Sequence, residues 1–381
     1  MEIDNAVAEF LEVEGKRAPT ALQSYYTEFA DFYDRRLWHQ LTESVERFTQ
    51  QPDARPHLIS LYQHFVVDWE KKINPVKLVI IALAIARQYQ DIHQALEFIE
   101  NIQTKVDTDA SQDARALAMF EAAHFRLLLG QLDATAEGLE KGEAILDGLA
   151  SVEQVIHASF YRVSADYYKA KADFGQYYKN ALLYLACVTL DAMPKEEKVE
   201  RAHDLALAAL LSDKIYNFGD LLMHPILQSL QGTPHAWLGE VLTVFNAGQI
   251  TRFDSFASQF AKQPLLQSHA PFLRQKVCLM TLIELMFQRI STHRRIPFND
   301  IAQTIHLPLE EVELLVMKAL SLELIRGSID QVDQVVNIRW VQPRFLDKAQ
   351  IKDMAEQLQQ WKEKVAGLSA QMEAQSQELI A

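Results

Sequence analysis

The chain has little of the material from which catalytic and nucleotide-binding sites are built. Its 381 residues include only two cysteines and 12 glycines. Cys187 and Cys278 lie in apolar helical stretches and form neither a CxxC pair nor a disulfide framework, so we expect buried, inert thiols in a reducing compartment. No GxxxxGKS/T or GxGxxG sequence occurs, which excludes the common glycine-rich phosphate loops.

Metal-site and hydrolase motifs are missing as well. The 12 histidines include no HxH pair and no HExxH, and no GxSxG occurs. His57 and His64 can share a helix face but lack a third ligand at a suitable spacing. His203 beside Asp204 is typical of a helix-surface pair rather than an acid–base dyad. We therefore expect no enzymatic activity, no cofactor and no metal.

Long hydrophobic runs and excess positive charge are also lacking. The longest apolar run, Leu78–Ala86, is under half of the roughly 20 residues that a membrane helix needs. The net charge of −14 opposes attraction to nucleic acid or anionic membranes. The acidic N-terminus does not resemble a signal peptide, and no N-x-S/T sequon occurs. We expect a protein of the cytoplasm and nucleus with no membrane partner.

What the chain does have is helical periodicity. From about residue 25 to 261, apolar residues recur at helical spacing and strand signals are almost absent. Short turns of one style separate the helices: Tyr89–Asp91, Leu129–Gln131, Phe174–Gln176, Phe218–Asp220 and Ala247–Gln249. The central glycines are spaced 175 − 130 = 45 and 219 − 175 = 44 residues apart, close to the roughly 40–47 of a two-helix repeat. We expect a right-handed-type solenoid of helix hairpins, with left-handed glycines ending helices, divided into N-terminal repeats (1–170) and further repeats (171–270).

Residues 271–345 are predicted to contain one more helix and a winged-helix module. A short apolar strand at Ile296 and Phe298 is followed by a helix capped by Asn299, a break at Leu307–Pro308, a second helix and two β-rich runs. The runs 324–329 and 335–341 join through the turn 330–334, with Val336, Ile338 and Trp340 expected on one face. We expect the edge of this sheet to pair with a neighbouring protein through Ile329, Val335, Val336 and Asn337.

The second helix of the module has the wrong charge for nucleic acid. Glu310, Glu311, Glu313 and Glu323 face a single cation, Lys318, where phosphate contacts require arginine and lysine. Over 271–343 the chain has eight basic and eight acidic residues, whereas a DNA-binding winged helix is distinctly basic. The module is therefore predicted to bind protein.

The last segment, 346–381, has a heptad pattern. Its apolar residues follow strict 3-4 steps, which are typical of a coiled coil or helical bundle; they are Ile351, Met354, Leu358, Trp361, Val365, Leu368 and Met372. Three heptads are too few to be stable alone in water, so this seam predicts partner helices. Packing back onto its own domain is the alternative.

With these parts placed, four runs of sequence are informative: YYTEFADFYDRRLWHQLT (25–42), ALLYLA (181–186), IYNFGDLLMHPI (215–226) and GSIDQVD with WVQPR (327–344). In these runs and in its order of parts the chain resembles the PCI family, whose members build the proteasome lid, the COP9 signalosome and translation initiation factor 3. The resemblance implies helical repeats ending in a winged helix.

It also implies a function, that of a noncatalytic scaffold in the lid of the proteasome regulatory particle, supporting assembly and ubiquitin-dependent protein degradation. Such a scaffold is a hetero-oligomer with other PCI and lid subunits, joined through winged-helix edges and a bundle of C-terminal helices. Its N-terminal repeats would lie near the ubiquitin-receptor subunit. A signalosome or initiation-factor PCI subunit remains the alternative within the family. Outside it, a nucleic-acid-binding winged-helix protein and a helical-repeat peptide receptor stay open.

Overall fold

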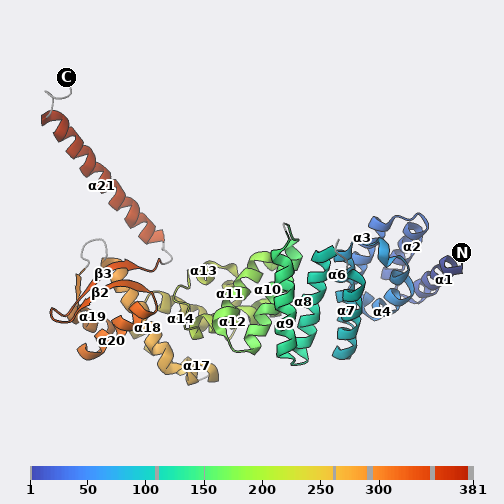
Figure 1. Cartoon of the computed structure of the whole chain (residues 1–381), viewed down its shortest axis with the longest axis horizontal. Helices are drawn as coiled ribbons and strands as arrows, with labels where there is room; N and C mark the ends of the chain where they lie inside the picture. Colours follow the sequence, from blue (N-terminus) through green and yellow to red (C-terminus); the bar gives the residue numbers. More distant parts are fainter. Residues whose placement is uncertain are drawn as a thin grey trace. The chain divides into compact units, whose positions relative to one another are not determined.

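The computed structural model describes residues 2–107, 111–149, 151–260, 263–289, 295–343 and 348–375 (Figure 1). The chain forms two compact units that divide after Pro194. The sequence predicted a boundary at residue 170. Residue 170 is the end of α10 (Gln154–Ala170), which packs against α11 (Phe174–Cys187) as one hairpin. The first unit therefore includes α11 as well.

The first unit is built from helices alone among its described residues. Its main helices are α1 (Glu2–Arg17), α2 (Thr20–Asp34), α3 (Trp38–Thr49), α6 (Pro75–Ala86), α7 (Ile92–Val106), α8 (Gln112–Leu128), α9 (Leu132–Asp147), α10 and α11. Between α3 and α6 run short helical pieces, namely Pro52–His57, α4 (Leu58–Leu61), Tyr62–Val66, α5 (Val67–Trp69) and Glu70–Lys72. Leu190–Ala192 forms one further turn.

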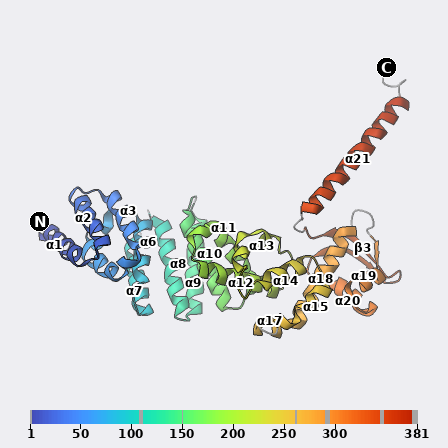
Figure 2. The ribbon, with the colours of Figure 1, turned by 180° about the vertical axis from the view of Figure 1, so that it is seen from behind.

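These helices pair as the predicted hairpins. The pairs α6–α7, α8–α9 and α10–α11 pack together, and α3, α6, α8 and α10 contact one another in succession as one row (Figure 2). The left-handed glycine expected between α8 and α9 is present, since Gly130 has φ +78°. The same expectation is wrong for Gly175, which lies inside the first turn of α11, and Ala172 with φ 58° makes the left-handed turn instead.

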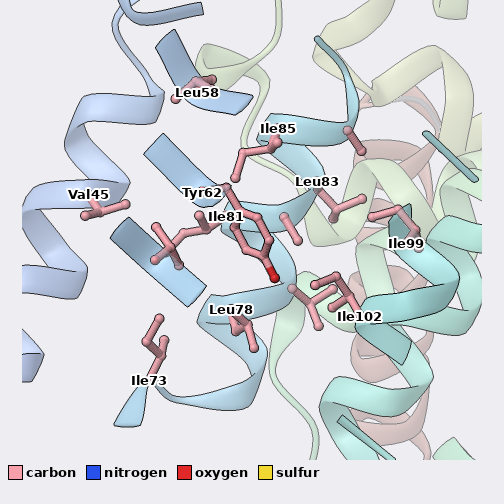
Figure 3. Packing of buried hydrophobic residues seen from close by; sticks show 14 of the residues in the cluster. Val45, Leu58, Tyr62, Ile73, Leu78, Ile81, Leu83, Ile85, Ile99 and Ile102 are labelled. Atoms are coloured by element: carbon pink, nitrogen blue, oxygen red, sulfur yellow. The ribbon is translucent and has the colours of Figure 1, made fainter. Parts of the chain in front are cut away.

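The core of the first unit centres on α6. This helix is apolar around almost its whole circumference, as expected of a helix enclosed by others. The Asn74 side chain accepts a hydrogen bond from the Val76 N–H at 2.9 Å and so caps its N-terminus. Figure 3 shows Val45 of α3 on one side of α6 and Ile99 and Ile102 of α7 on the other.

Aromatic rings complete this core towards the N-terminus. The fully buried Phe29 lies 5.5 Å from the Phe48 ring and 5.7 Å from the Phe65 ring. Phe29 of α2 and Leu41 of α3 are both fully buried. Such ring pairs stabilise the packing beyond their buried area by roughly 1 kcal/mol each.

The second unit begins with a helical part. Its helices are α12 (Lys195–Leu211), α13 (Gly219–Met223), the turn Pro225–Leu230, α14 (Trp237–Asn246), α15 (Ile250–Ser255), α16 (Ala257–Phe260), α17 (Pro264–Ser268) and α18 (Ala270–Arg289). Gly248, between α14 and α15, has the expected left-handed backbone with φ +62°. Gly219 does not, because it is the first residue of α13, where its N–H donates to the Asn217 side-chain oxygen at 3.0 Å.

A winged-helix module follows. It contains β1 (Arg295–Pro297), α19 (Phe298–Ile305), α20 (Leu309–Ser321), β2 (Ile325–Asp330) and β3 (Val335–Val341), in an antiparallel sheet of order β1-β3-β2. Ile301 and Ile305 of α19 and Val312 and Val316 of α20 are buried. The expected cap at Asn299 is wrong, because α19 begins at Phe298 and its N-cap is Pro297, two residues before Asn299.

The prediction that Trp340 lies on the same face of β3 as Val336 and Ile338 is wrong. Val336 and Ile338 are buried, but Trp340 is 37% exposed and Val341 is buried in its place. The register shifts between Arg326 and Gly327, so one extra residue of β3 bulges and the alternation moves on by one. The final helix, α21 (Lys348–Gln375), lies within the segment predicted as 346–381; its remaining residues 346–347 and 376–381 lie outside the described residues.

Candidate assembly surfaces

The strongest candidate surface is the apolar seam of α21. The seven predicted positions lie on a continuous helix (Figure 1). Their exposed fractions are Ile351 53%, Met354 48%, Leu358 62%, Trp361 66%, Val365 49%, Leu368 59% and Met372 63%. A line of large apolar side chains left this open is typical of a protein interface. Within the described residues, no part of the chain buries this seam.

Three of the four interface residues predicted in the winged-helix sheet lie in its central strand and not at an edge. Val335, Val336 and Asn337 lie in β3, the central strand, and pair with both β1 and β2. Val336 is 1% exposed and belongs to the core of the module. Ile329 lies in β2, which pairs with β3 alone in the described sheet. The sheet therefore has two outer strands, β1 and β2, and β2 is the longer of the two and contains Ile329.

The edge of β2 has a recognisable surface of its own. The Arg326 guanidinium lies over the Trp340 ring, 4.9 Å from its centroid. A Cβ atom on Gly327 would lie 2.2 Å from the Asn337 carbonyl oxygen, so only glycine permits this approach of the strands. The glycine in the run GSIDQVD is the one sequence signal that could have located the bulge.

The second helix of the module, α20, is acidic and partly apolar on its outside. Glu310 and Glu311 occupy its first turn, where they suit the helix dipole but repel phosphate. Leu314 and Met317 are 61% and 44% exposed. These side chains fit a protein surface rather than a DNA groove.

The described residues provide neither a metal-binding cluster nor a membrane-spanning helix. No group of three or more His, Cys, Asp or Glu side chains among them is arranged to hold a metal ion. None of their helices combines the length and apolarity required to cross a membrane. Cys278 is buried as expected, Cys187 is only half-buried, and burial raises the pKa of both thiols.

Three family models match successive parts of the chain. "PSD13 N-terminal repeats" matches residues 25–242, "PCI domain" matches 253–340 and "Rpn9 C-terminal helix" matches 344–376. "Probable 26S proteasome regulatory subunit rpn9" of Schizosaccharomyces pombe is 42% identical, with 97% of this chain and 96% of the relative covered.

Two further relatives agree with it. "26S proteasome non-ATPase regulatory subunit 13" of Dictyostelium discoideum is 38% identical over 98% of both chains. "26S proteasome regulatory subunit RPN9" of Saccharomyces cerevisiae is 36% identical over 95% of both. The chain belongs to the Rpn9 family of 26S proteasome regulatory subunits. The resemblance to PCI proteins is thereby confirmed, and so is the fold class of helical repeats, a PCI domain with a small antiparallel sheet and a C-terminal helix.

In this Rpn9-family chain, the sequence did not indicate that Lys276 is buried. Lys276 of α18 is 1% exposed, and its Nζ donates to the carbonyl oxygens of Ala209, Leu210 and Ser212 at 2.8, 3.1 and 2.6 Å. These are the orphan carbonyls at the end of α12. The rings of Tyr216, Phe218 and Phe272 surround the ammonium at 5.3–5.9 Å. Lys276 thus ties the last repeats to the helix that supports the winged helix.

Proposed function

We propose that the chain is a noncatalytic scaffold of the 26S proteasome lid, held in the complex by the seam of α21. The observation that carries this proposal is the exposure of all seven seam residues in the segment that matches the Rpn9 C-terminal helix. The relatives are named as regulatory and non-ATPase subunits, which agrees with a role in assembly rather than chemistry. Burial of these apolar side chains against partner helices would remove them from water and so contribute favourable binding free energy.

A second contact is proposed at the wing. The outer edge of β2 pairs with a strand of a neighbouring PCI subunit, with Ile329 setting the register. Val335, Val336 and Asn337 support this contact from the central strand, because they fix β2 in place. The partners are therefore other PCI and lid subunits in a hetero-oligomer.

Two finer proposals rest on the family resemblance. The N-terminal repeats lie near the ubiquitin-receptor subunit, and the protein works in the cytoplasm and nucleus. Both are tested in cells by proximity labelling from a tag on α1, with a tag after α21 as the matched control. Labelling of the receptor from both ends alike, or from neither, contradicts the first proposal.

The test of the scaffold function is Trp361→Asp, with Gln360→Asp as its control. Trp361 is the largest seam residue, and a buried aromatic anchor of this kind contributes roughly 2 kcal/mol or more to an interface. Gln360 carries the same charge change one position outside the seam. Co-expression with the sister PCI subunits followed by native size analysis should show loss of assembly for Trp361→Asp alone. Equal assembly of both variants would remove Trp361 from the interface.

A nucleic-acid-binding role is the competing function, and salt dependence separates the two. A winged helix that binds duplex DNA through phosphates loses affinity steeply as salt rises. The acidic first turn of α20 predicts no measurable binding to duplex DNA at physiological salt. Tight, salt-sensitive binding by the purified chain would overturn the scaffold assignment of this module.

A further inference from the structure

The first unit contains a groove that neither the winged helix nor α21 uses. Its volume is about 400 Å³, within the roughly 300–1,000 Å³ of ligand-binding clefts. Residues of α3, α6, α8 and α10 line it, together with the end of α11. These four helices form one row of the stacked hairpins. A groove that crosses one row of a helical solenoid follows the surface that such proteins use to bind extended partners.

The walls of the groove are apolar and its floor holds a fixed ion pair. The half-buried Ile80 and Ala84 contribute apolar surface, and so does Val155, which is 49% exposed. On the floor, Arg162 Nη2 donates to both carboxylate oxygens of Glu121 at 2.6 and 2.7 Å, and the Ser159 hydroxyl donates to the same carboxylate.

This carboxylate is therefore already neutralised. Glu121 is 3% exposed, so its charge is stable only because Arg162 and Ser159 bind it. Glu46, the other acidic residue of the lining, pairs with Lys77 at 3.2 Å. Neither acidic residue is available to a cation from solution.

Arg87 is the exception in this lining. It lies just after the end of α6, at the mouth of the groove, and is exposed. None of the ion pairs described among these residues includes Arg87, whereas Glu46 and Glu121 are paired with Lys77 and Arg162. The charge that the groove presents to a ligand is consequently positive, although the chain as a whole carries −14.

We propose that this groove binds an extended peptide segment with an acidic side chain, which pairs with Arg87 while neighbouring apolar side chains pack on Ile80 and Val155. A guanidinium binds a carboxylate through two parallel hydrogen bonds, which fixes position as well as charge. The exposed Gln50 side chain at the rim can donate to and accept from the peptide backbone. This binding site is independent of the scaffold contacts at the wing and α21.

The test uses the full-length chain and a fluorescein-labelled nine-residue peptide that alternates leucine and glutamate. Fluorescence anisotropy should report saturable binding that weakens with salt. The same peptide with glutamine in place of glutamate should bind at least tenfold more weakly. Arg87→Glu should lose binding by a similar factor, and Arg87→Lys should retain part of it because the charge is kept without the bidentate geometry.

Two matched variants separate this site from adventitious binding. Arg35→Glu makes the same charge change at an exposed arginine of the first unit outside the groove, and it should bind the peptide as the parent does. Ala158→Trp fills the groove without changing any charge and should abolish binding, with circular dichroism checking that the chain still folds. No binding of the glutamate peptide to the parent, or equal binding to the folded Ala158→Trp variant, would overturn the proposal.

Discussion

At the scale of single residues, Lys276 links protonation to the stability of the second unit. Burial lowers its pKa from 10.5 to about 7, against a smaller opposing effect of Asp213. Three carbonyl acceptors match the three N–H donors of an ammonium, whereas a neutral amine has two. In the unfolded chain the same lysine keeps its proton up to about pH 10.5.

This difference predicts the sign of a pH dependence. Between about pH 7 and 10.5 the unfolded state binds more protons at Lys276 than the folded state, so its contribution to the free energy of unfolding rises with pH. The slope is at most about 1.4 kcal/mol per pH unit. Urea unfolding of the parent and of Lys276→Met, at pH 7 to 9.5, should give the steeper rise for the parent. Parallel curves for the two proteins would contradict the lowered pKa.

The close contact between Gly142 of α9 and Phe120 of α8 allows a prediction about packing in the first unit. A Cβ atom there would lie 2.2 Å from the Phe120 ring of α8, so Gly142→Ala should destabilise the first unit by roughly 1–3 kcal/mol. The control is Gly239→Ala in α14, where nothing lies within 4 Å of the added atom and helix propensity alone should stabilise by up to about 1 kcal/mol. Thermal unfolding should therefore shift in opposite directions for two chemically identical changes.

Side chains of this kind mark the limit of prediction from the sequence. A single lysine in an apolar helix is ordinarily predicted to be exposed to solvent. Nothing in the sequence around position 276 indicates that three carbonyl groups at the end of α12 accept hydrogen bonds from it. Glu121 and Arg162 are likewise 41 residues apart, and only the stacking of α8 on α10 makes them partners. Their contacts depend on tertiary packing, which local periodicity does not encode.

At the scale of elements, the spacing of apolar residues was sufficient to predict the apolar face of a single helix but not the order in which strands pair. The 3-4 steps predicted the seam of α21 because a helix face depends only on residues a few positions apart. The order β1-β3-β2 could not be predicted in this way, because β1 has only three residues. Its insertion beside β3 converts the expected edge into the centre of the sheet.

The central position of β3 changes what proline does there. Asn337 pairs with Arg295 on one side and Ser328 on the other, so Asn337→Pro should disrupt the sheet itself rather than docking alone. The exposed turn residue Val332, 94% accessible, provides the control, and Val332→Ala should change stability by less than about 0.5 kcal/mol. Circular dichroism and limited proteolysis of both variants measure the difference. A folded Asn337→Pro module would show that the ladder at this residue is dispensable.

At the scale of the whole molecule, folding and assembly are separable. The cores of both units are buried without α21, whose described side chains are exposed. Deleting residues 347–381 should therefore leave the unfolding transition of the remainder nearly unchanged while incorporation into the proteasome lid falls. Thermal unfolding and native size analysis of the truncated chain measure the two effects. Cooperative loss of a whole unit on truncation would mean that the tail packs within its own chain.

The exposure of Trp361 has a spectroscopic consequence. The chain has five tryptophans; Trp69 is 1% exposed and Trp361 is 66% exposed. Indole emission moves to shorter wavelength when the ring leaves water, so covering the seam should remove a red component from the intrinsic fluorescence. Trp361→Phe should retain assembly and lose this change. The subunit thus carries a native optical reporter, with which the rate of its incorporation can be followed without any label.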